Sequence, residues 1–249
     1  MQVALIQSGL EVSFHSKAEN LAQTLELIDA AQAELVVLPE MWPTGYASFE
    51  RYATDAEPLD GTLVRALCAA AREKGVWLAP GSFPEKLDGR LYNTTMLISP
   101  EGGIEGVYRK IHVFGYQSKE KELVSEGPTP TIVKTPFGKV GLAICYDLRF
   151  PELFRYYAKN GVTMFIVPAS WPSARKHVWE LFAAARAHEN MCWMLACNSH
   201  ADSLVIAPNS EVVAQGAARP QTITVDIDLD LVRRTREDFP VLDDAHWVF

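Results

Sequence analysis

The chain has 249 residues, a formal net charge of −8, 48% hydrophobic residues and 22% charged residues. This length suffices for one large hydrophobic core, and the composition is typical of a folded protein rather than of a disordered one. Because acidic residues are in excess, binding to nucleic acid or to an anionic membrane surface is disfavoured, and a small molecule is the expected partner.

Short apolar segments alternate with helical patterns in the first half of the chain. The patterns predict a strand at 3–7, a helix at 17–33, a strand at 34–40, a helix at 61–75, a strand at 76–83 and a hairpin at 90–110.

The second half continues this alternation. It predicts a hairpin at 131–145, a helix at 151–161, a strand at 162–170, a helix at 174–190, a strand at 191–198, two short strands at 202–216 and 222–229, and a polar terminal helix. Helices between apolar strands predict an α/β fold, and the hairpins predict mixed sheets. No linker, repeat or low-complexity segment is seen, so we expect a single domain spanning residues 1–249.

The N-terminus and the cysteines bear on the location of the protein. The sequence MQVALIQSGLEV has no basic region, and its apolar run is too short for a signal peptide or a membrane span. The four cysteines (Cys68, Cys145, Cys192 and Cys197) form no CxxC pair and no zinc-like cluster with histidine. We therefore expect reduced thiols in the cytoplasm, with no metal and no cofactor.

Three apolar strands end in a reactive or charged residue. LVVLPEMWPTGY carries Glu40, GVYRKIHVFG carries Lys110, and GLAICYDLRFPE carries Cys145. Because functional sites in α/β folds gather just beyond strand ends, we expect these three side chains to lie together.

A thiol, a carboxylate and an ammonium form a useful set for acyl transfer. Cys145 needs a neighbouring base or cation to become a nucleophile. Glu40 can take the thiol proton and deliver it to a leaving amine. Lys110 and the backbone N–H of Tyr146 can stabilise the oxyanion.

Each of these residues also has a structural interpretation when it is taken alone. Cys145 can be a small core residue, Glu40 can cap a helix, and Lys110 can lie on a solvated strand edge. Their joint occurrence favours a catalytic site.

The segments LPEMWPTGY, YRKIHVFG and ICYDLRFPE resemble the three signature segments of the carbon–nitrogen hydrolase (nitrilase) superfamily, and the likeness extends from VALIQ to TVDIDL. The resemblance implies an α-β-β-α sandwich of two mixed sheets that forms a homodimer through its helices. It also implies hydrolysis of a small amide, carbamoyl compound or nitrile through a thioester, without a metal. By matching positions, Glu40 is the general base, Lys110 the oxyanion stabiliser and Cys145 the nucleophile.

Many members of the family have a second glutamate seven positions before a glycine. Gly127 in KEKELVSEGPTP selects Glu120 for this position, although Glu122 and Glu126 lie nearby. The implied role of Glu120 is to hold Lys110 and the substrate amide. A charged surface turn is the alternative.

The segment WPSAR most resembles the omega-amidase branch, whose substrates carry a carboxylate. Arg175 can bind that carboxylate, or it can be a solvated arginine at a helix start. Lys176 is the next candidate for this role. Trp171 is expected to form a wall of the pocket.

Two aromatic residues near the signature segments complete the expected site. Tyr46 ends the first segment and Tyr146 follows the nucleophile, and both are expected to line the substrate pocket. Arg149 and Glu152 are expected to form an ion pair that stabilises the turn or a dimer surface.

One departure from the family pattern weakens the assignment of a substrate. The chain passes directly from Asn198 to the next strand, without a glycine-rich loop of about ten further residues, and Ser210 replaces the usual glycine. A shorter loop or a more open pocket are both compatible with this departure.

Several other functions remain as alternatives. Within the family these are hydrolysis of an N-carbamoyl amine or of deaminated glutathione and, less favoured, of a nitrile. A papain-like enzyme would need a histidine beside Cys145, and His112, which we interpret as structural, is the one near a motif. The alternative outside enzymes is a catalytically silent binding protein of the same fold.

Overall fold

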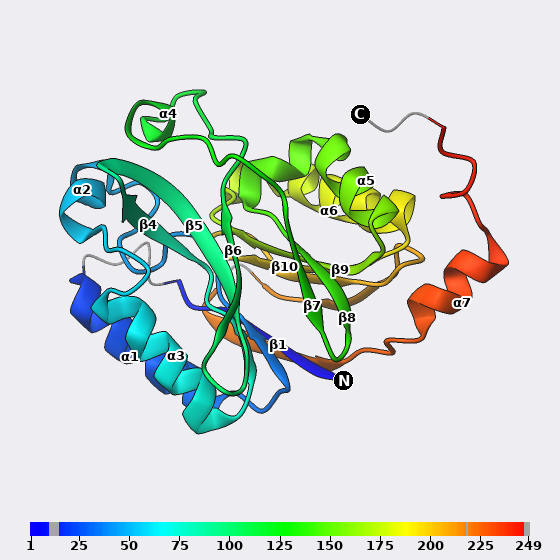
Figure 1. Cartoon of the computed structure of the whole chain (residues 1–249), viewed down its shortest axis with the longest axis horizontal. Coiled ribbons are helices and arrows are strands. Elements are labelled where there is room, and N and C mark those ends of the chain that lie inside the picture. Colours follow the sequence, from blue (N-terminus) through cyan, green and yellow to red (C-terminus); the bar gives the residue numbers. More distant parts are fainter. Residues whose placement is uncertain (10–14, 218, 247–249) are drawn as a thin grey trace.

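The computed structural model describes residues 1–9, 15–217 and 219–246, and within them two β-sheets lie face to face between pairs of helices (Figure 1). The first sheet contains β1 (Gln2–Gln7), β2 (Leu35–Val37), β3 (Trp77–Ala79), β4 (Ser82–Leu87), β5 (Arg90–Ile98), β6 (Ile104–Arg109) and β13 (Gln221–Asp226). The second contains β7 (Thr131–Thr135), β8 (Gly138–Leu142), β9 (Val162–Ala169), β10 (Trp193–Asn198), β11 (Leu204–Ile206) and β12 (Val212–Gln215).

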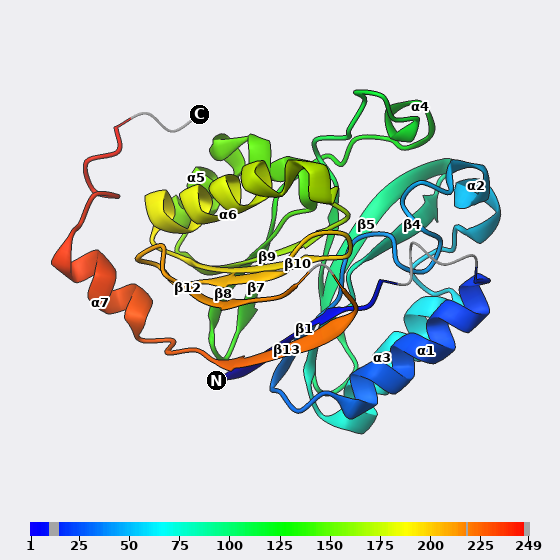
Figure 2. The same cartoon turned by 180° about the vertical axis from the view of Figure 1, so that it is seen from behind.

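Helices cover the outer face of each sheet. α1 (Lys17–Ala30) and α3 (Thr62–Lys74) lie on the first sheet, and α5 (Pro151–Lys159) and α6 (Lys176–Asn190) lie on the second (Figures 1 and 2). This arrangement confirms the predicted α-β-β-α sandwich.

Both sheets are mixed, as predicted from the hairpins. In the first sheet β1, β2 and β3 are parallel neighbours, whereas β13 and β5 run antiparallel to them. In the second, β8, β9 and β10 are parallel, and β7 and β11 flank them in antiparallel orientation.

The central strands contain apolar runs because both of their faces are covered. Val3 and Leu5 of β1 belong to the core between the sheets, whereas Ala4 and Ile6 pack in the core beneath α1 and α3. Successive side chains of a strand point to opposite faces, so a strand buried on both sides reads as an uninterrupted apolar run.

The helix ends follow local sequence signals. Ser16 and Glu19 form a capping box at the start of α1, in which the Ser16 side chain accepts a hydrogen bond from the Glu19 backbone N–H. α3 ends at Gly75, which has a left-handed φ of +69°, and α5 begins with Pro151 in its first turn.

Two predicted strands are each divided in the structure. The strand expected at 76–83 breaks at Gly81, where φ is +72° and a Cβ atom would lie 2.0 Å from the carbonyl oxygen of Pro39. β4 begins after this break and forms a hairpin with β5 through the left-handed Asp88 and Gly89. The strand expected at 202–216 is a hairpin of β11 and β12.

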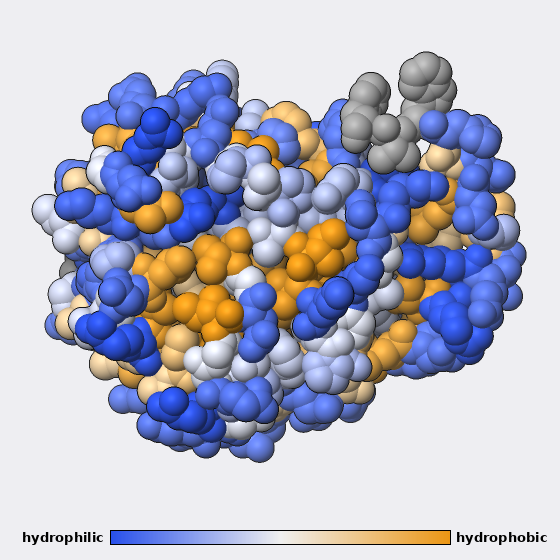
Figure 3. Space-filling view, viewed as in Figure 1, coloured by the Kyte–Doolittle hydropathy of each residue, from blue (hydrophilic) through white to orange (hydrophobic). Residues whose placement is uncertain are grey.

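The sheets approach each other along β6 and β7, where the Thr131 hydroxyl donates a hydrogen bond of 2.8 Å to the carbonyl of Val107. Apolar side chains gather around this part of the surface and polar side chains surround them (Figure 3).

Shorter α-helices also lie outside the layers: α2 (Tyr52–Asp55), α4 (Glu120–Leu123) and α7 (Leu231–Asp238), the last beside the second sheet (Figure 1). No helix in the described ranges is long and apolar enough to cross a membrane.

Candidate active site

Cys145 lies at a sharp turn beyond the end of β8. It is the first residue of a 3-10 helix, η3 (Cys145–Arg149), and has a φ of +46°, which is unusual for a residue with a side chain. The Asp147 carboxylate holds this turn, because its Oδ2 atom accepts a hydrogen bond of 2.8 Å from the backbone N–H of Ile144. The turn therefore presents the thiol at the end of a buried strand, as the sequence predicts.

Asp147 also joins the turn to the segment after β6. Its carboxylate accepts hydrogen bonds from the Tyr108 hydroxyl at 2.8 Å and from the His112 backbone N–H at 3.1 Å. The Nδ1 atom of His112 lies 2.7 Å from the same carboxylate, and its ring stacks on Phe150 with centroids 3.7 Å apart. His112 thus supports the turn, in agreement with its structural interpretation.

Glu40 reaches from the first sheet to the second. It follows β2 and is fully buried. Its Oε1 atom accepts a hydrogen bond of 2.8 Å from the Nζ of Lys110, and its Oε2 atom accepts one of 2.9 Å from the backbone N–H of Ser170, which follows β9. The Cys145 thiol lies near this carboxylate, whose charge raises the pKa of the thiol in addition to the effect of burial.

Lys110 follows β6 and lies between two glutamates. Its Nζ atom is 2.8 Å from Oε1 of Glu40 and 3.0 Å from each carboxylate oxygen of Glu120, and its side chain has no solvent exposure. The structure therefore brings Glu40, Lys110 and Cys145 together from three strand ends.

Glu120 is the second glutamate of this cluster, and Glu122 and Glu126 are not part of it. Glu120 is fully buried at the start of α4, whereas the two neighbouring glutamates are exposed. Its Oε2 atom accepts hydrogen bonds from the Phe114 backbone N–H at 3.0 Å and from the Tyr46 hydroxyl at 3.3 Å.

Asn93 on β5 also belongs to the cluster, and no sequence motif predicted it. Its Nδ2 atom donates hydrogen bonds of 2.8 Å to Glu40 and 2.9 Å to Glu120. A signal was available in LYNTTMLI, where an asparagine precedes an apolar strand end. The sequence alone, however, does not indicate which residues this asparagine contacts.

The buried charges perturb one another. Burial raises the pKa of Glu40 above its ordinary value, although the charge of Lys110 opposes this effect. Burial works against the charge of Lys110, but Glu120 and Glu40 outweigh it and hold the Lys110 pKa well above its ordinary value. Burial and the Glu40 charge raise the pKa of Cys145, so the resting thiol is neutral and needs a base to become a nucleophile.

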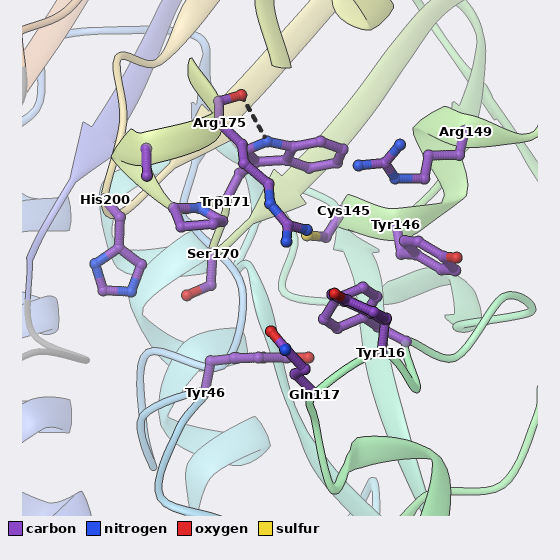
Figure 4. A pocket seen from close by; sticks show the side chains of 13 residues that line it. Tyr46, Tyr116, Gln117, Cys145, Tyr146, Arg149, Ser170, Trp171, Arg175 and His200 are labelled. Carbon is purple, nitrogen blue, oxygen red and sulfur yellow. Dashed lines mark hydrogen bonds between the residues drawn. The ribbon is translucent and has the colours of Figure 1, made fainter. Parts of the chain in front are cut away.

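A pocket of about 420 Å³ opens onto Cys145 (Figure 4). Tyr46, Tyr146, Trp171 and Arg175, the residues predicted to contact substrate, all line it. Both N–H groups of Trp171 bond within the protein, since its backbone N–H donates to the Asn198 side chain and its Nε1 to the Arg175 carbonyl. The indole is therefore held in place where it lines the pocket.

Arg149 also lines the pocket, and its predicted ion pair with Glu152 is wrong. Its guanidinium lies 5.0 Å from the ring centroid of Trp171, 5.2 Å from that of Phe182 and 5.7 Å from that of Tyr146. Glu152 lies in the first turn of α5, where it is exposed to solvent. Arg149 therefore faces the pocket (Figure 4).

Lys176, the other proposed carboxylate binder, already has acidic partners. Its Nζ atom is 2.7 Å from the Asp202 carboxylate and 3.7 Å from that of Glu180. Arg175 has no acidic partner in the described ranges, and its guanidinium lies 5.7 Å from the ring centroid of Tyr116. Of the two neighbouring cations, Arg175 is the one available to a ligand.

The short loop after Asn198 reaches the pocket through His200, whose pKa is lowered by burial. Ser210, at the position of the usual glycine, has a φ of +71°. This left-handed conformation explains why glycine is favoured there.

A neutral thiol beside a carboxylate and an ammonium suits acyl transfer through a covalent intermediate. Within the part of the chain that the structure describes, no group of three or more histidine, cysteine, aspartate or glutamate side chains is arranged to hold a metal ion.

Comparisons with known proteins identify the family of this chain. The family model described as carbon-nitrogen hydrolase matches residues 2–237. A 2-oxoglutaramate amidase of Paenarthrobacter nicotinovorans is 30% identical over 258 residues, which cover 95% of this chain and 88% of that protein. Omega-amidase NIT2 of Xenopus tropicalis is 34% identical over 248 residues, which cover 90% of this chain and 88% of that protein.

A solved structure shows the same fold. Saccharomyces cerevisiae Nit3, a member of branch 10 of the nitrilase superfamily, superposes with a TM-score of 0.90 at 26% sequence identity, over 99% of this chain and 97% of that chain. The chain described here belongs to the carbon-nitrogen hydrolase family.

Proposed function

We propose that this protein hydrolyses the terminal amide of a small carboxylic acid and releases ammonia, with 2-oxoglutaramate or 2-oxosuccinamate as the type of substrate. The observation that carries the proposal is the buried contact of Lys110 with Glu40 and Glu120 next to the Cys145 thiol, at the end of an open pocket. The printed names of the relatives support the choice of an omega-amide.

In the first half of the reaction, Glu40 accepts the proton of Cys145 as the sulfur attacks the amide carbonyl carbon. The carbonyl π electrons move to the oxygen, and Lys110 and the backbone N–H of Tyr146 stabilise the resulting oxyanion. Lys110 can do so because its contacts with Glu40 and Glu120 fix its ammonium in place. Glu40 then gives the proton to the leaving nitrogen and the C–N bond breaks. Ammonia is released, and the acyl group remains bound to Cys145 as a thioester.

In the second half, water attacks the thioester carbonyl and Glu40 accepts a proton from that water. The oxyanion collapses, the C–S bond breaks, and Glu40 returns the proton to the Cys145 sulfur. The products are the carboxylic acid and the regenerated thiol. Glu120 positions Lys110 and the substrate amide throughout.

The pocket favours an amide that also carries a carboxylate. Arg149 and Arg175 both line it, and neither forms an ion pair with an acidic side chain in the described ranges. A guanidinium binds a carboxylate through two parallel hydrogen bonds, so these two side chains are the proposed substrate anchors. Tyr46, Tyr146 and Trp171 provide the apolar walls around the carbon chain.

Ammonia release from a matched substrate panel tests this function. The panel contains 2-oxoglutaramate, 2-oxosuccinamate, glutamine, N-carbamoyl-β-alanine, deaminated glutathione, butyramide and simple nitriles. We expect the two 2-oxo amides to give the highest kcat/KM. Preference for the carbamoyl compound, deaminated glutathione or a nitrile would move the protein to another branch of the family, and no turnover at all would favour a silent binding protein.

We also propose that the chain is a single domain in a cytoplasmic homodimer. The outer faces of α5 and α6 support the dimer, because Tyr156 and Leu181 expose 39% and 63% of their surface there. Light scattering coupled to gel filtration tests the dimer, with a Leu181→Glu variant expected to be monomeric, and a monomeric parent protein would refute the dimer.

The thiol state of Cys68, Cys145 and Cys192 supports a reducing compartment.

A further inference from the structure

The side chain of Asn93 binds both buried glutamates of the site. We propose that Asn93 is a positioning residue of the reaction: it holds Glu40 so that the Oε2 atom, and not Oε1, exchanges protons with Cys145. This inference rests on the proposed function, because it concerns the proton transfers of that mechanism.

Asn93 and Lys110 bridge the same two carboxylate oxygens. The Nδ2 atom of Asn93 lies 2.8 Å from Oε1 of Glu40 and 2.9 Å from Oε1 of Glu120. The Nζ atom of Lys110 lies 2.8 Å and 3.0 Å from the same two atoms. The four groups therefore form a closed ring of hydrogen bonds, with the two acceptors opposite each other and the two donors between them.

This ring makes the two oxygens of Glu40 unequal. Oε1 accepts two hydrogen bonds, one from Asn93 and one from Lys110, so both of its lone-pair positions are filled. Oε2 accepts one, from the backbone N–H of Ser170, and keeps a second position for a proton. If Asn93 is removed, Oε1 regains a vacant position and the carboxylate loses one of the contacts that fix its plane.

The orientation of the Asn93 amide is determined by its surroundings. Its Oδ1 atom is buried without a hydrogen-bond partner in the described ranges, which is costly for a polar atom. The reversed amide would place Oδ1 against two carboxylate oxygens, which repel it. The fold therefore leaves one acceptor unsatisfied and keeps the NH₂ group toward Glu40 and Glu120.

Asn93 acts through Glu40 and not through the substrate. It is fully buried on β5 and is not among the residues that line the pocket. Its loss should therefore lower kcat and leave KM nearly unchanged.

The charged and titratable groups that face Glu40 come from several elements: Lys110 after β6, Glu120 of α4, Cys145 of η3 and Tyr46 after β2. Lys110 favours the ionised carboxylate, and Glu120 disfavours it. A hydrogen bond donated to the ionised form lowers the pKa of a carboxyl group, so the loss of the Asn93 donor should raise the Glu40 pKa. The acid limb of kcat/KM, where activity disappears as Glu40 becomes protonated, should then move to higher pH.

The test compares Asn93→Leu and Asn93→Asp with Thr95→Val as the matched control. Leucine keeps the approximate volume and removes the donor, whereas aspartate keeps the shape and adds a third carboxyl group. Thr95 lies two positions along the same strand, so it shares the face of Asn93, and its buried hydroxyl also has no partner in the described ranges.

We expect Asn93→Leu to lower kcat by about ten- to a hundredfold, the effect of losing charge-assisted hydrogen bonds, with KM changed by less than about twofold. The acid limb of its kcat/KM profile should lie at higher pH than the acid limb of the parent protein. The acid limb of Asn93→Asp should lie at still higher pH. Thr95→Val should keep the parent kcat and acid limb. Parent-like kinetics of Asn93→Leu, or a lower kcat with an unmoved acid limb in both Asn93 variants, would overturn the proposal.

Iodoacetamide alkylation of Cys145 separates this proposal from the choice of substrate. The alkylation rate should fall as pH falls through the Glu40 pKa, because thiolate formation needs the ionised carboxylate. Asn93→Leu should move that fall to higher pH even if no amide in the panel is hydrolysed. An alkylation profile identical to that of the parent protein would reject the role of Asn93 and leave the proposed function standing.

Discussion

The Nζ atom of Lys110 lies 2.8 Å from Oε1 of Glu40, and neither side chain exposes any surface to solvent. A buried ion pair of this kind adds little to the stability of the folded protein compared with an apolar pair of the same size. Removing one partner, however, leaves an uncompensated buried charge and is strongly destabilising. In this site the cation serves two carboxylates, since Glu120 is also within 3.0 Å of the ammonium. The cluster thus couples the stability of the protein to its chemistry.

Replacing Lys110 by methionine should therefore destabilise the protein as well as inactivate it. We expect a loss of about 3–5 kcal/mol in the free energy of unfolding at pH 7, the usual cost of breaking a buried pair. Without the cation, burial holds the pKa of Glu40 above that of the unfolded chain, so the penalty should shrink as the pH is lowered and Glu40 becomes protonated. Urea unfolding at pH 7 and pH 5 measures the free energy of unfolding of the parent protein and the variant, with Lys176→Met as the surface control. An equal loss of free energy at both pH values would refute this explanation of the penalty.

The two glutamates should respond differently to substitution by glutamine. Glu40→Gln removes the proton acceptor and should lower kcat by about 10²- to 10⁴-fold or more. Glu120→Gln keeps much of the positioning role, so it should lower kcat less and allow a thioester to accumulate, visible as an added acyl mass on the intact protein. If Glu120 proves indispensable and Glu40 replaceable, the two roles are inverted.

The pH dependence of the parent enzyme should report the buried base. Burial raises the pKa of Glu40, and the reaction needs its ionised form, so kcat/KM should fall as the pH falls through that raised value. The acid limb should therefore lie above the ordinary pKa of a glutamate, which is about 4.3. Initial rates from pH 4 to pH 9 locate it, and a limb at or below the ordinary value would mean that Glu40 is not the titrating base.

The arginines of the pocket should matter for acidic amides and not for neutral ones. Losing a charge-assisted contact costs about 1.5–3 kcal/mol, so Arg149→Met or Arg175→Met should raise KM for 2-oxoglutaramate by roughly ten- to a hundredfold. Butyramide, which has no carboxylate, should be nearly unaffected. Lys176→Met is the matched control, since Lys176 already pairs with Asp202.

Equal losses for acidic and neutral amides would assign a structural role to the arginine concerned. A larger effect at Arg149 than at Arg175 would show which of the two guanidinium groups binds the carboxylate. Equal turnover of both classes of amide by the parent protein would end the omega-amidase proposal.

The sequence was sufficient to predict the layers and the strand ends because these depend on local patterns. Apolar runs such as the one at β1 indicate strands covered on both faces, and Glu40 and Cys145 follow two strands with buried ends, β2 and β8. Lys110 follows β6, whose first residues are exposed. Glu120 could be chosen among three glutamates only through its spacing from Gly127. That glycine is required because a Cβ atom there would lie 2.0 Å from the Arg109 carbonyl oxygen.

The features that could not be predicted depend on contacts between distant segments. Asn93 reaches partners 53 and 27 residues away, and its position on a strand gives no sign of which face it occupies. Arg149 and Glu152 are close in sequence, but Arg149 lines the pocket and Glu152 is exposed to solvent at the start of α5. The break at Gly81 results from the close approach of Pro39, which the local sequence does not reveal.

Ammonia release by a Cys145→Ala variant shows whether Cys145 is the nucleophile on which the proposed mechanism depends. The thiol is the group that forms the proposed thioester, so the variant should fold with a parent-like circular dichroism spectrum and release no ammonia above background from 2-oxoglutaramate. The parent protein should release one ammonia for each amide consumed. Turnover by Cys145→Ala at the parent rate would contradict the mechanism.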